Sequence, residues 1–350
     1  MGLLLTDQTP EFGRLIDEIY TRQLEEDREV SKKLDARARQ KMYQDVKYNV
    51  DFLYTSMCLE DDSIFTKYAI WVYQLLSHLM TYCTREELRD SMIVHYELMR
   101  TVIEHTISEE KKPKLHRMLD CAIKATKEEC ADNSEGRADS GVYAQEIKQY
   151  MDCLLHADSK GAMRLAAGYV KDGIPLSDLC VDIIAEAMRQ VGDLWHRHII
   201  SVDMEHYCTS ITQMALSQFY PLIFSQERKG KSIVVACVGS ELHEMGARMV
   251  ADLFEYDGWD SIYLGAAVPV EALETAVSEH GTCMAALSVT MPQHLPLCRE
   301  AVRRLRHRYP DMKIAVGGNA FADTEIWKDW GADICTKDAR ELVQWADEVL

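Results

Sequence analysis

The chain has 350 residues, which is long for one small domain and sufficient for two or three units with hydrophobic cores of their own. Hydrophobic residues make up 47% of it, with only 8 prolines and 17 glycines, a composition that excludes disordered and fibrous proteins. The formal net charge of −18 disfavours direct binding to nucleic acid, because an acidic surface repels phosphate backbones. The short basic cluster of Arg303, Arg304, Arg306 and Arg308 has the spacing of a solvated helix face.

The cysteines and the apolar segments indicate where the protein resides. Eleven cysteines are scattered singly, with no C-x-x-C pair, and no signal peptide opens the chain. No apolar run approaches the roughly 18 to 20 residues that a membrane span requires. We therefore expect a soluble, cytoplasmic protein with reduced cysteines.

Residues 1–130 are expected to form an all-α domain. Apolar residues recur there at spacings of three and four, as in the run Tyr68, Val72, Leu75, Leu76 and Leu79. A second helix is predicted through Leu88 and Ile103, and a third after Pro113. Residues 131–142 are rich in Gly, Ser, Asp and Asn, which predicts a linker.

The rest of the chain divides into two further predicted regions. Residues 143–226 read as a four-helix bundle, with breaks near Asp158, at Gly173 to Pro175 and after Trp195. Residues 230–350 alternate continuous apolar strands with helices, which predicts a parallel sheet of five strands in flavodoxin-like order, covered on both faces. Ligands bind such sheets at the carboxyl ends of the strands.

Three sequence fragments fall at those predicted strand ends. ELHEMG, with Glu241, His243 and Gly246, follows the first strand; SVT, residues 288–290, and GGN, residues 317–319, end the third and fourth. Forty-one residues separate Gly246 from Ser288, and twenty-six separate Thr290 from Gly317. The glycines would let a bulky ligand contact backbone. A groove along one edge of the sheet is therefore predicted.

The order and spacing of these fragments resemble the D-x-H-x-x-G, S-x-L, G-G signature of domains that hold cobalamin (vitamin B12) in its base-off, His-on form. The resemblance implies that His243 is the lower ligand to cobalt, that Glu241 hydrogen-bonds its other ring nitrogen and that Ser288 extends this chain. Such a carboxylate fixes the tautomer of a metal-bound histidine. Ser288, Thr290, Gly317 and Gly318 would line the slot for the displaced base.

Two positions depart from that signature, because Glu241 stands for Asp and Thr290 for Leu. The longer Glu side chain alters the geometry of the hydrogen bond and keeps its chemistry. The structural alternative is a flavodoxin-like sheet with glycines in tight turns and one surface histidine.

A second resemblance concerns residues 143–226, where nine residues separate Trp195 from the pair Glu205 and His206. This W-x9-E-H arrangement is similar to the helical cap of B12-dependent photoreceptors, which bind adenosylcobalamin in the dark and lose the adenosyl group in light. It implies that Trp195 packs on the adenosyl group and that Glu205 hydrogen-bonds to it. His196 would take the vacated upper cobalt position after photolysis, giving a bis-histidine adduct. Plain packing and helix capping are the alternative.

The histidines do not form a predicted zinc site. His196, His198, His206, His243 and His294 lie in fragments without paired cysteines or H-x-x-x-H spacing.

The segment DDSIFTKYAIWVYQLLSHL, residues 61–79, resembles the degenerate globin-like domain of photocobilins, photoreceptors that pair B12 with a linear tetrapyrrole. That resemblance implies a biliverdin pocket lined by residues such as Tyr68, Trp71 and His78 or His95. An aromatic stripe at helical spacing is more often core, however.

We therefore expect a light sensor rather than an enzyme, acting through a light-dependent homo-oligomer or a separate output protein. The alternative is a corrinoid methyl carrier of a methyltransferase system, which uses a similar cap without the W-x9-E-H element. A radical isomerase subunit would need a barrel to hold its substrate, and no barrel fits in this chain.

Overall fold

A computed structural model describes residues 10–129, 141–322 and 324–350. The chain divides into two compact units, the first comprising residues 1–136 with His196–His198 and the second residues 137–195 with 199–350. The linker predicted at 131–142 lies almost wholly outside the described residues. No helix in the described part of the chain is long and apolar enough to cross a membrane.

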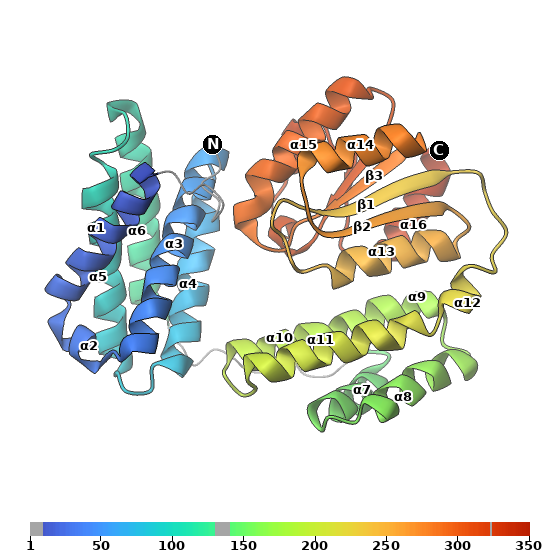
Figure 1. Ribbon diagram of the computed structural model, residues 1–350, viewed down its shortest axis with the longest axis horizontal. Helices are drawn as coiled ribbons and strands as arrows, with labels where there is room; N and C mark the ends of the chain where they lie inside the picture. The colour runs from blue at the N-terminus through green and yellow to red at the C-terminus, as the bar shows by residue number, and fades with distance from the viewer. Residues whose placement is uncertain (1–9, 130–140, 323) are drawn as a thin grey trace. The chain divides into compact units, whose positions relative to one another are not determined.

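The described part of the first unit is entirely helical, as the sequence predicted (Figure 1). Its helices are α1 (Pro10–Glu26), α2 (Arg28–Lys33), α3 (Ala36–Leu59), α4 (Asp62–Leu79), α5 (Arg85–Ile103), the 3-10 turn η1 (Glu109–Lys111) and α6 (Lys112–Glu128). Local chemistry sets their boundaries: Thr84 and Glu87 form a capping box at the start of α5, and Pro113 lies in the first turn of α6. Aromatic side chains such as Phe65 and Tyr96 fill the core.

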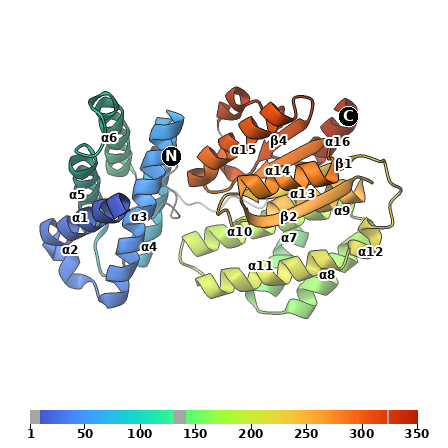
Figure 2. The same ribbon diagram turned by 45° about the horizontal axis from the view of Figure 1, so that its top comes forward.

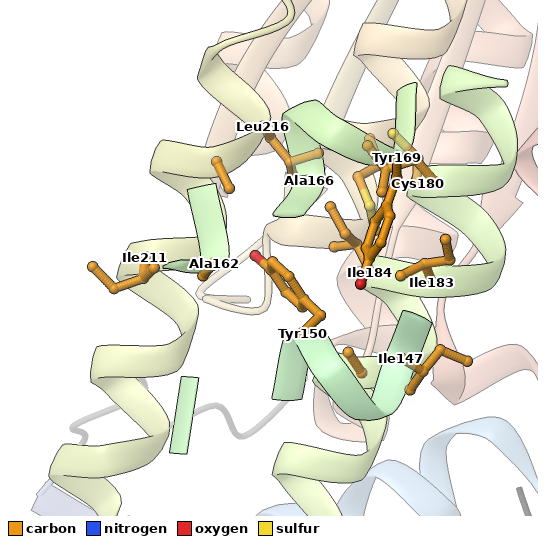
Figure 3. Packing of buried hydrophobic residues seen from close by; sticks show 14 of the residues in the cluster. Ile147, Tyr150, Ala162, Ala166, Tyr169, Cys180, Ile183, Ile184, Ile211 and Leu216 are labelled. Carbon is orange, nitrogen blue, oxygen red and sulfur yellow. The ribbon is translucent and has the colours of Figure 1, made fainter. Parts of the chain in front are cut away.

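The second unit begins with the predicted four-helix bundle. It contains α7 (Ala144–Leu155), α8 (Ser159–Lys171), α9 (Leu176–Asp178), the π-helical segment η2 (Leu179–Ile184), α10 (Ala185–His196), α11 (Val202–Ser217) and α12 (Tyr220–Ile223). The segments α9, η2 and α10 run on without a break, so they supply the third helix. Figure 3 shows the core, where Tyr150 lies among aliphatic side chains and donates its hydroxyl hydrogen to Thr212 at 3.1 Å.

The remainder of the second unit is the predicted sheet of five parallel strands, in the order β2-β1-β3-β4-β5. The strands are β1 (Ser232–Val238), β2 (Asp260–Val268), β3 (Met284–Ser288), β4 (Lys313–Gly317) and β5 (Ile334–Cys335). The helices are α13 (Met245–Tyr256), α14 (Val270–His280), α15 (Leu295–Arg308) and α16 (Ala339–Val349), with the 3-10 turns η3 (Pro292–His294), η4 (Asn319–Phe321) and η5 (Ile326–Trp330). Helices α13 and α16 cover one face, and α14 and α15 the other (Figure 1).

Strand β2 is irregular towards its carboxyl end, the edge of the sheet where a ligand is expected. Along β1 and β2 the paired residues are Val235 with Tyr263 and then Ala236 with Gly265, so the ladder skips Leu264. A second skip precedes Val268. Gly265 and Ala267 have φ of +81° and +55°. Extra residues of this kind bend a strand and redirect its side chains.

The bundle and the sheet pack on each other within the second unit, with α10 and α11 running along the side of the sheet that α13 covers (Figures 1 and 2). Met249 and Leu253 of α13 belong to the buried core of the bundle. At one end of this contact the Arg340 guanidinium binds the carboxylates of Asp178 and Asp182, at 2.9 and 2.6 Å. The bundle and the sheet are therefore joined by a shared buried core and by an ion pair at one end of the contact.

Candidate functional site

The loop between β1 and α13 carries the candidate ligand His243. Gly239 begins this loop with φ of +75°, a conformation that favours glycine. Backbone bonds from the irregular end of β2 hold the loop in place, since the Ala267 amide donates to the Glu241 carbonyl at 2.9 Å and the Gly239 amide to the Val268 carbonyl at 3.0 Å. The bends in β2 thus support the loop from one side.

Glu241 is fully buried, yet its carboxylate accepts four hydrogen bonds. Oε1 accepts from the backbone amide of His243 at 3.0 Å and from its ring Nδ1 at 2.6 Å. Oε2 accepts from the amides of Thr290 and Met291 at 2.8 and 2.7 Å. Burial opposes ionisation, but the hydrogen bonds from His243 and Met291 outweigh it and lower the pKa of Glu241 to about 2. The group is therefore a carboxylate at neutral pH.

The His243 ring is oriented by this carboxylate while most of its surface stays accessible. Its side chain is 60% exposed, in contrast to Glu241 beneath it. The hydrogen bond to Glu241 raises the pKa of His243, burial opposes this shift, and the charges of Glu241 and Glu205 add to it. With the Nδ1 proton held by Glu241, the neutral ring offers Nε2 as a metal ligand.

Ser288 and Gly317 end neighbouring strands and lie opposite each other in the register of β3 and β4. The extension of the hydrogen-bond chain by Ser288 stays a prediction. The second oxygen of Glu241, Oε2, accepts from the backbone amides of Thr290 and Met291, which follow β3. Amides satisfy the carboxylate because the chain turns over it immediately after Ser288.

Gly318 allows the two strand ends to approach closely. It has φ of +97°, and a Cβ at this position would lie 2.3 Å from the carbonyl oxygen of Val289. Gly317 is less restricted, since its Cβ would meet nothing nearer than 3.6 Å. Half-buried Thr290 and Gly317 lie at this edge, together with exposed Gly318 and Gly246. Backbone rather than side chains therefore lines this part of the site.

The structure brings one predicted residue of the bundle close to His243. Glu205 lies in the first turn of α11, near enough for its charge to raise the pKa of His243. Its carboxylate also contacts His206 Nδ1 at 2.6 Å and accepts from the Thr209 hydroxyl at 3.0 Å. Trp195 is half-buried near the end of α10, and His196, the last residue of α10, groups with the first compact unit.

The residues named for a bilin pocket lie on two helices of the first unit. Tyr68 and His95 are buried, and Tyr68 stacks on Phe52 with ring centroids 3.8 Å apart. Trp71 and His78 are half-buried, and the His78 ring Nδ1 lies 2.8 Å from the Gln74 carbonyl oxygen. Tyr68 and His95 therefore belong to the buried core of this unit, whereas Trp71 and His78 lie at its partly exposed margin.

Sequence reasoning missed several residues that shape the site. Glu244 follows His243 directly, and its carboxylate binds Gln213 of α11 and Tyr263 of β2, both at 3.2 Å. His294 is buried beside Glu241 and His243, and burial lowers its pKa. A polar residue next to a ligand histidine was the available signal for Glu244, but the sequence did not indicate its partners.

Comparison with known proteins identifies the chemistry that this site serves. Residues 231–344 match a family model described as a B12 binding domain, and residues 146–220 match a second model with the same description. This part of the chain is a cobalamin-binding module. An exposed histidine ring with one nitrogen fixed, beside a strand edge lined by glycine backbone, fits such a group.

Relatives with established names are corrinoid proteins. Dimethylamine corrinoid protein 1 of Methanosarcina acetivorans is 25% identical over 214 residues, which are 59% of this chain and 98% of the relative. A corrinoid protein of Desulfitobacterium hafniense is 22% identical over 213 residues, covering 59% and 96% of the two chains. The structure of the Methanosarcina barkeri monomethylamine corrinoid protein matches with a TM-score of 0.52 and 19% identity, covering 59% of this chain and all of that one. That match shows the shared fold.

Proposed function

We propose that this protein is a corrinoid carrier that holds cobalamin through His243 and presents a methyl group to a separate methyltransferase. The observation that carries the proposal is the His243 ring, held at Nδ1 by Glu241 and exposed at the carboxyl edge of the sheet. The names of the corrinoid relatives support it, since the match spans nearly their whole length. The protein itself would not be the catalyst of the transfer.

The residues of this chain would bind and orient the cofactor. Bound cobalt would supply a centre that accepts and releases a methyl group. Glu241 keeps the Nδ1 proton on His243, so that Nε2 would be available to bind the metal, and it raises the basicity of the ring. The backbone at Gly317 and Gly318, which carries no side chains, would line the slot for the displaced base.

A light sensor that binds adenosylcobalamin is the second candidate, and one observation favours it. Glu205 of the W-x9-E-H pattern lies near enough to His243 for its charge to raise the pKa of that histidine, and in this proposal its carboxylate accepts a hydrogen bond from the adenosyl group. In this proposal Trp195 packs on the adenosyl group, His206 accompanies Glu205, and His196 takes the upper position after photolysis. The output would pass to another protein or through self-association.

Affinity measurements in the dark separate the two proposals. The apo protein is titrated with methylcobalamin and with adenosylcobalamin, and the two Kd values are compared for wild type and Glu205→Ala. A carrier should bind methylcobalamin at least as tightly as adenosylcobalamin. The ratio of the two Kd values should change less than about twofold in Glu205→Ala. A sensor should favour adenosylcobalamin by about tenfold, in the range expected of a hydrogen bond to a charged group, and Glu205→Ala should abolish that preference.

Illumination provides a second, independent test of the sensor proposal. The complex with adenosylcobalamin is exposed to green light, and its absorption spectrum is followed. The sensor should convert to a stable product that His196→Ala cannot form, whereas an unchanged spectrum contradicts the light-sensor proposal. Biliverdin binding is tested separately: a red-absorbing band that co-elutes with the protein supports it, and the lack of both removes it.

A further inference from the structure

Helix α13 begins directly after the His243 loop and carries a row of polar side chains along the bundle. Glu244, Arg248 and Asp252 are spaced four residues apart, so they share one face of the helix. Glu244 is the N-cap residue, but its side chain makes no cap hydrogen bond to its own helix. We call these three residues the polar ladder.

The first member of the polar ladder binds α11. Gln213 donates its amide hydrogen to Glu244 Oε1 at 3.2 Å, and the Tyr263 hydroxyl lies 3.2 Å from Oε2. Gly265 in the irregular end of β2 lies next to this carboxylate, since a Cβ there would be in ordinary contact with Oε2 at 3.5 Å. Glu244 thus joins the His243 loop to helix α11 and to strand β2, which supports the loop.

The other two members extend the same connection. Arg248 donates to the Tyr220 hydroxyl at 2.6 Å, and Tyr220 donates to Asp252 at 3.1 Å. The Arg248 guanidinium also lies over the rings of Tyr220 and Tyr263, 5.6 and 5.9 Å from their centroids. The guanidinium therefore has two aromatic neighbours, one from the bundle and one from β2.

The geometry points to a positioning role for the hydrogen bond between Gln213 and Glu244. Together with the other residues of the polar ladder, it holds helix α11 at a set distance from His243, the proposed cobalt ligand. Gln213 lies two turns after Glu205 on α11, and Glu244 lies one residue after His243. One hydrogen bond would thereby set the distance between His243 and Glu205, the two residues proposed to flank the cofactor. The inference rests on the proposed binding of cobalamin through His243, whichever upper ligand is carried.

A double-mutant cycle tests whether Gln213 and Glu244 act as one link. Hydroxocobalamin Kd is measured for Gln213→Ala, Glu244→Ala and the double variant. Each single variant should weaken binding about fivefold, and the double variant no further than about twofold beyond the weaker single one. Glu244→Gln keeps an acceptor oxygen for Gln213 and should remain within about twofold of wild type. Effects that multiply in the double variant would overturn the inference.

Amide hydrogen exchange of the apo protein provides a readout that needs no cofactor. Gln213→Ala should accelerate exchange in residues 241–248, which lie on the other side of the link. The matched control is Gln218→Ala, because within the described ranges Gln218 donates to the carbonyls of Met163 and Ala215, both inside the bundle. Unchanged exchange at 241–248 in Gln213→Ala, or equal acceleration in the control, contradicts the link. If His243→Ala leaves Kd unchanged, the cobalamin proposal fails instead, and the exchange result still judges the link.

Discussion

Each compact unit buries a polar side chain, Glu241 in the second and His95 in the first, and the two differ in how their hydrogen bonds are satisfied. In the second unit, fully buried Glu241 has four donors converging on its carboxylate. In the first unit, His95 is 8% exposed, and its Nε2 has no hydrogen-bond partner among the described residues. Burial alone therefore does not mark a site. A buried polar group indicates a functional site where hydrogen-bond donors converge on it and where it orients an exposed group such as His243.

The largest expected effect is a loss of cobalamin affinity at the His243 site, where the donors converge on Glu241. His243→Ala removes the proposed lower ligand, so hydroxocobalamin should bind at least about 100-fold more weakly, since even removal of an outer partner of a metal ligand costs 10–100-fold. Titration of the apo protein followed by absorption measures this. His280→Ala, at the exposed end of α14, is the control. Equal affinities in the two variants would mean that His243 is not the ligand.

A substitution at Gly318 tests whether the backbone at the ends of β3 and β4 is as tightly held as the side chains of Glu241 and His243. Gly318→Ala places a Cβ against the Val289 carbonyl at a positive φ, and should lower the free energy of unfolding of the second unit by about 2–3 kcal/mol. Urea unfolding measures it. Gly317→Ala meets only ordinary contacts and should cost less than about 1 kcal/mol. Similar losses in both would show that the strand ends rearrange freely.

His95 tests the other side of the comparison. Burial lowers the pKa of His95 to about 4, so the unfolded chain binds a proton more readily than the folded one. Stability is fully present above pH 6.5 and declines as the pH falls towards 4. Wild type should lose about 2 kcal/mol between pH 7 and pH 5 that His95→Leu does not lose, as measured by urea unfolding. The exposed His105→Leu control should behave like wild type.

Asp252 gives the opposite and smaller pH dependence in the second unit. Burial raises its pKa to about 6, although the hydrogen bond from Tyr220 opposes this shift. Its contribution is complete below about pH 4 and is lost as the pH rises through 6. Asp252→Asn keeps an acceptor for Tyr220 and should be about 1 kcal/mol more stable than wild type at pH 7.5, with no difference at pH 4. Asp311→Asn, on the surface, is the control, and a gain in it equal to that of Asp252→Asn would remove this explanation.

Much of the second unit could be predicted because its signals are local. Apolar runs gave the strands and their order, Pro175 and Gly173 marked a helix boundary, and the His243 fragment lay where a parallel sheet binds ligands. The partners of Glu241 could not be predicted, since the Thr290 and Met291 amides are backbone donors that any residue would supply. The link from Glu244 to Gln213 depends on how two helices pack, which no single segment encodes.

The first unit was less informative for the same reason. Its helices were readable from spacing and caps, including the break at Pro113. Aromatic residues such as Tyr68 occupy core positions with the same periodicity that a ligand pocket would show. Periodicity therefore identifies the helices and leaves the purpose of their buried faces open.

The two skipped positions in β2 have a consequence for how this region can change in length. Each extra residue reverses which side of the sheet the following side chains face, and two of them restore the original alternation by Val268. Loss of a single residue would turn Val268 outward and displace the Ala267 amide from the Glu241 carbonyl. Homologous sequences should therefore show insertions or deletions of two residues here rather than one. The even number of extra residues should be kept more strictly than the identity of those residues.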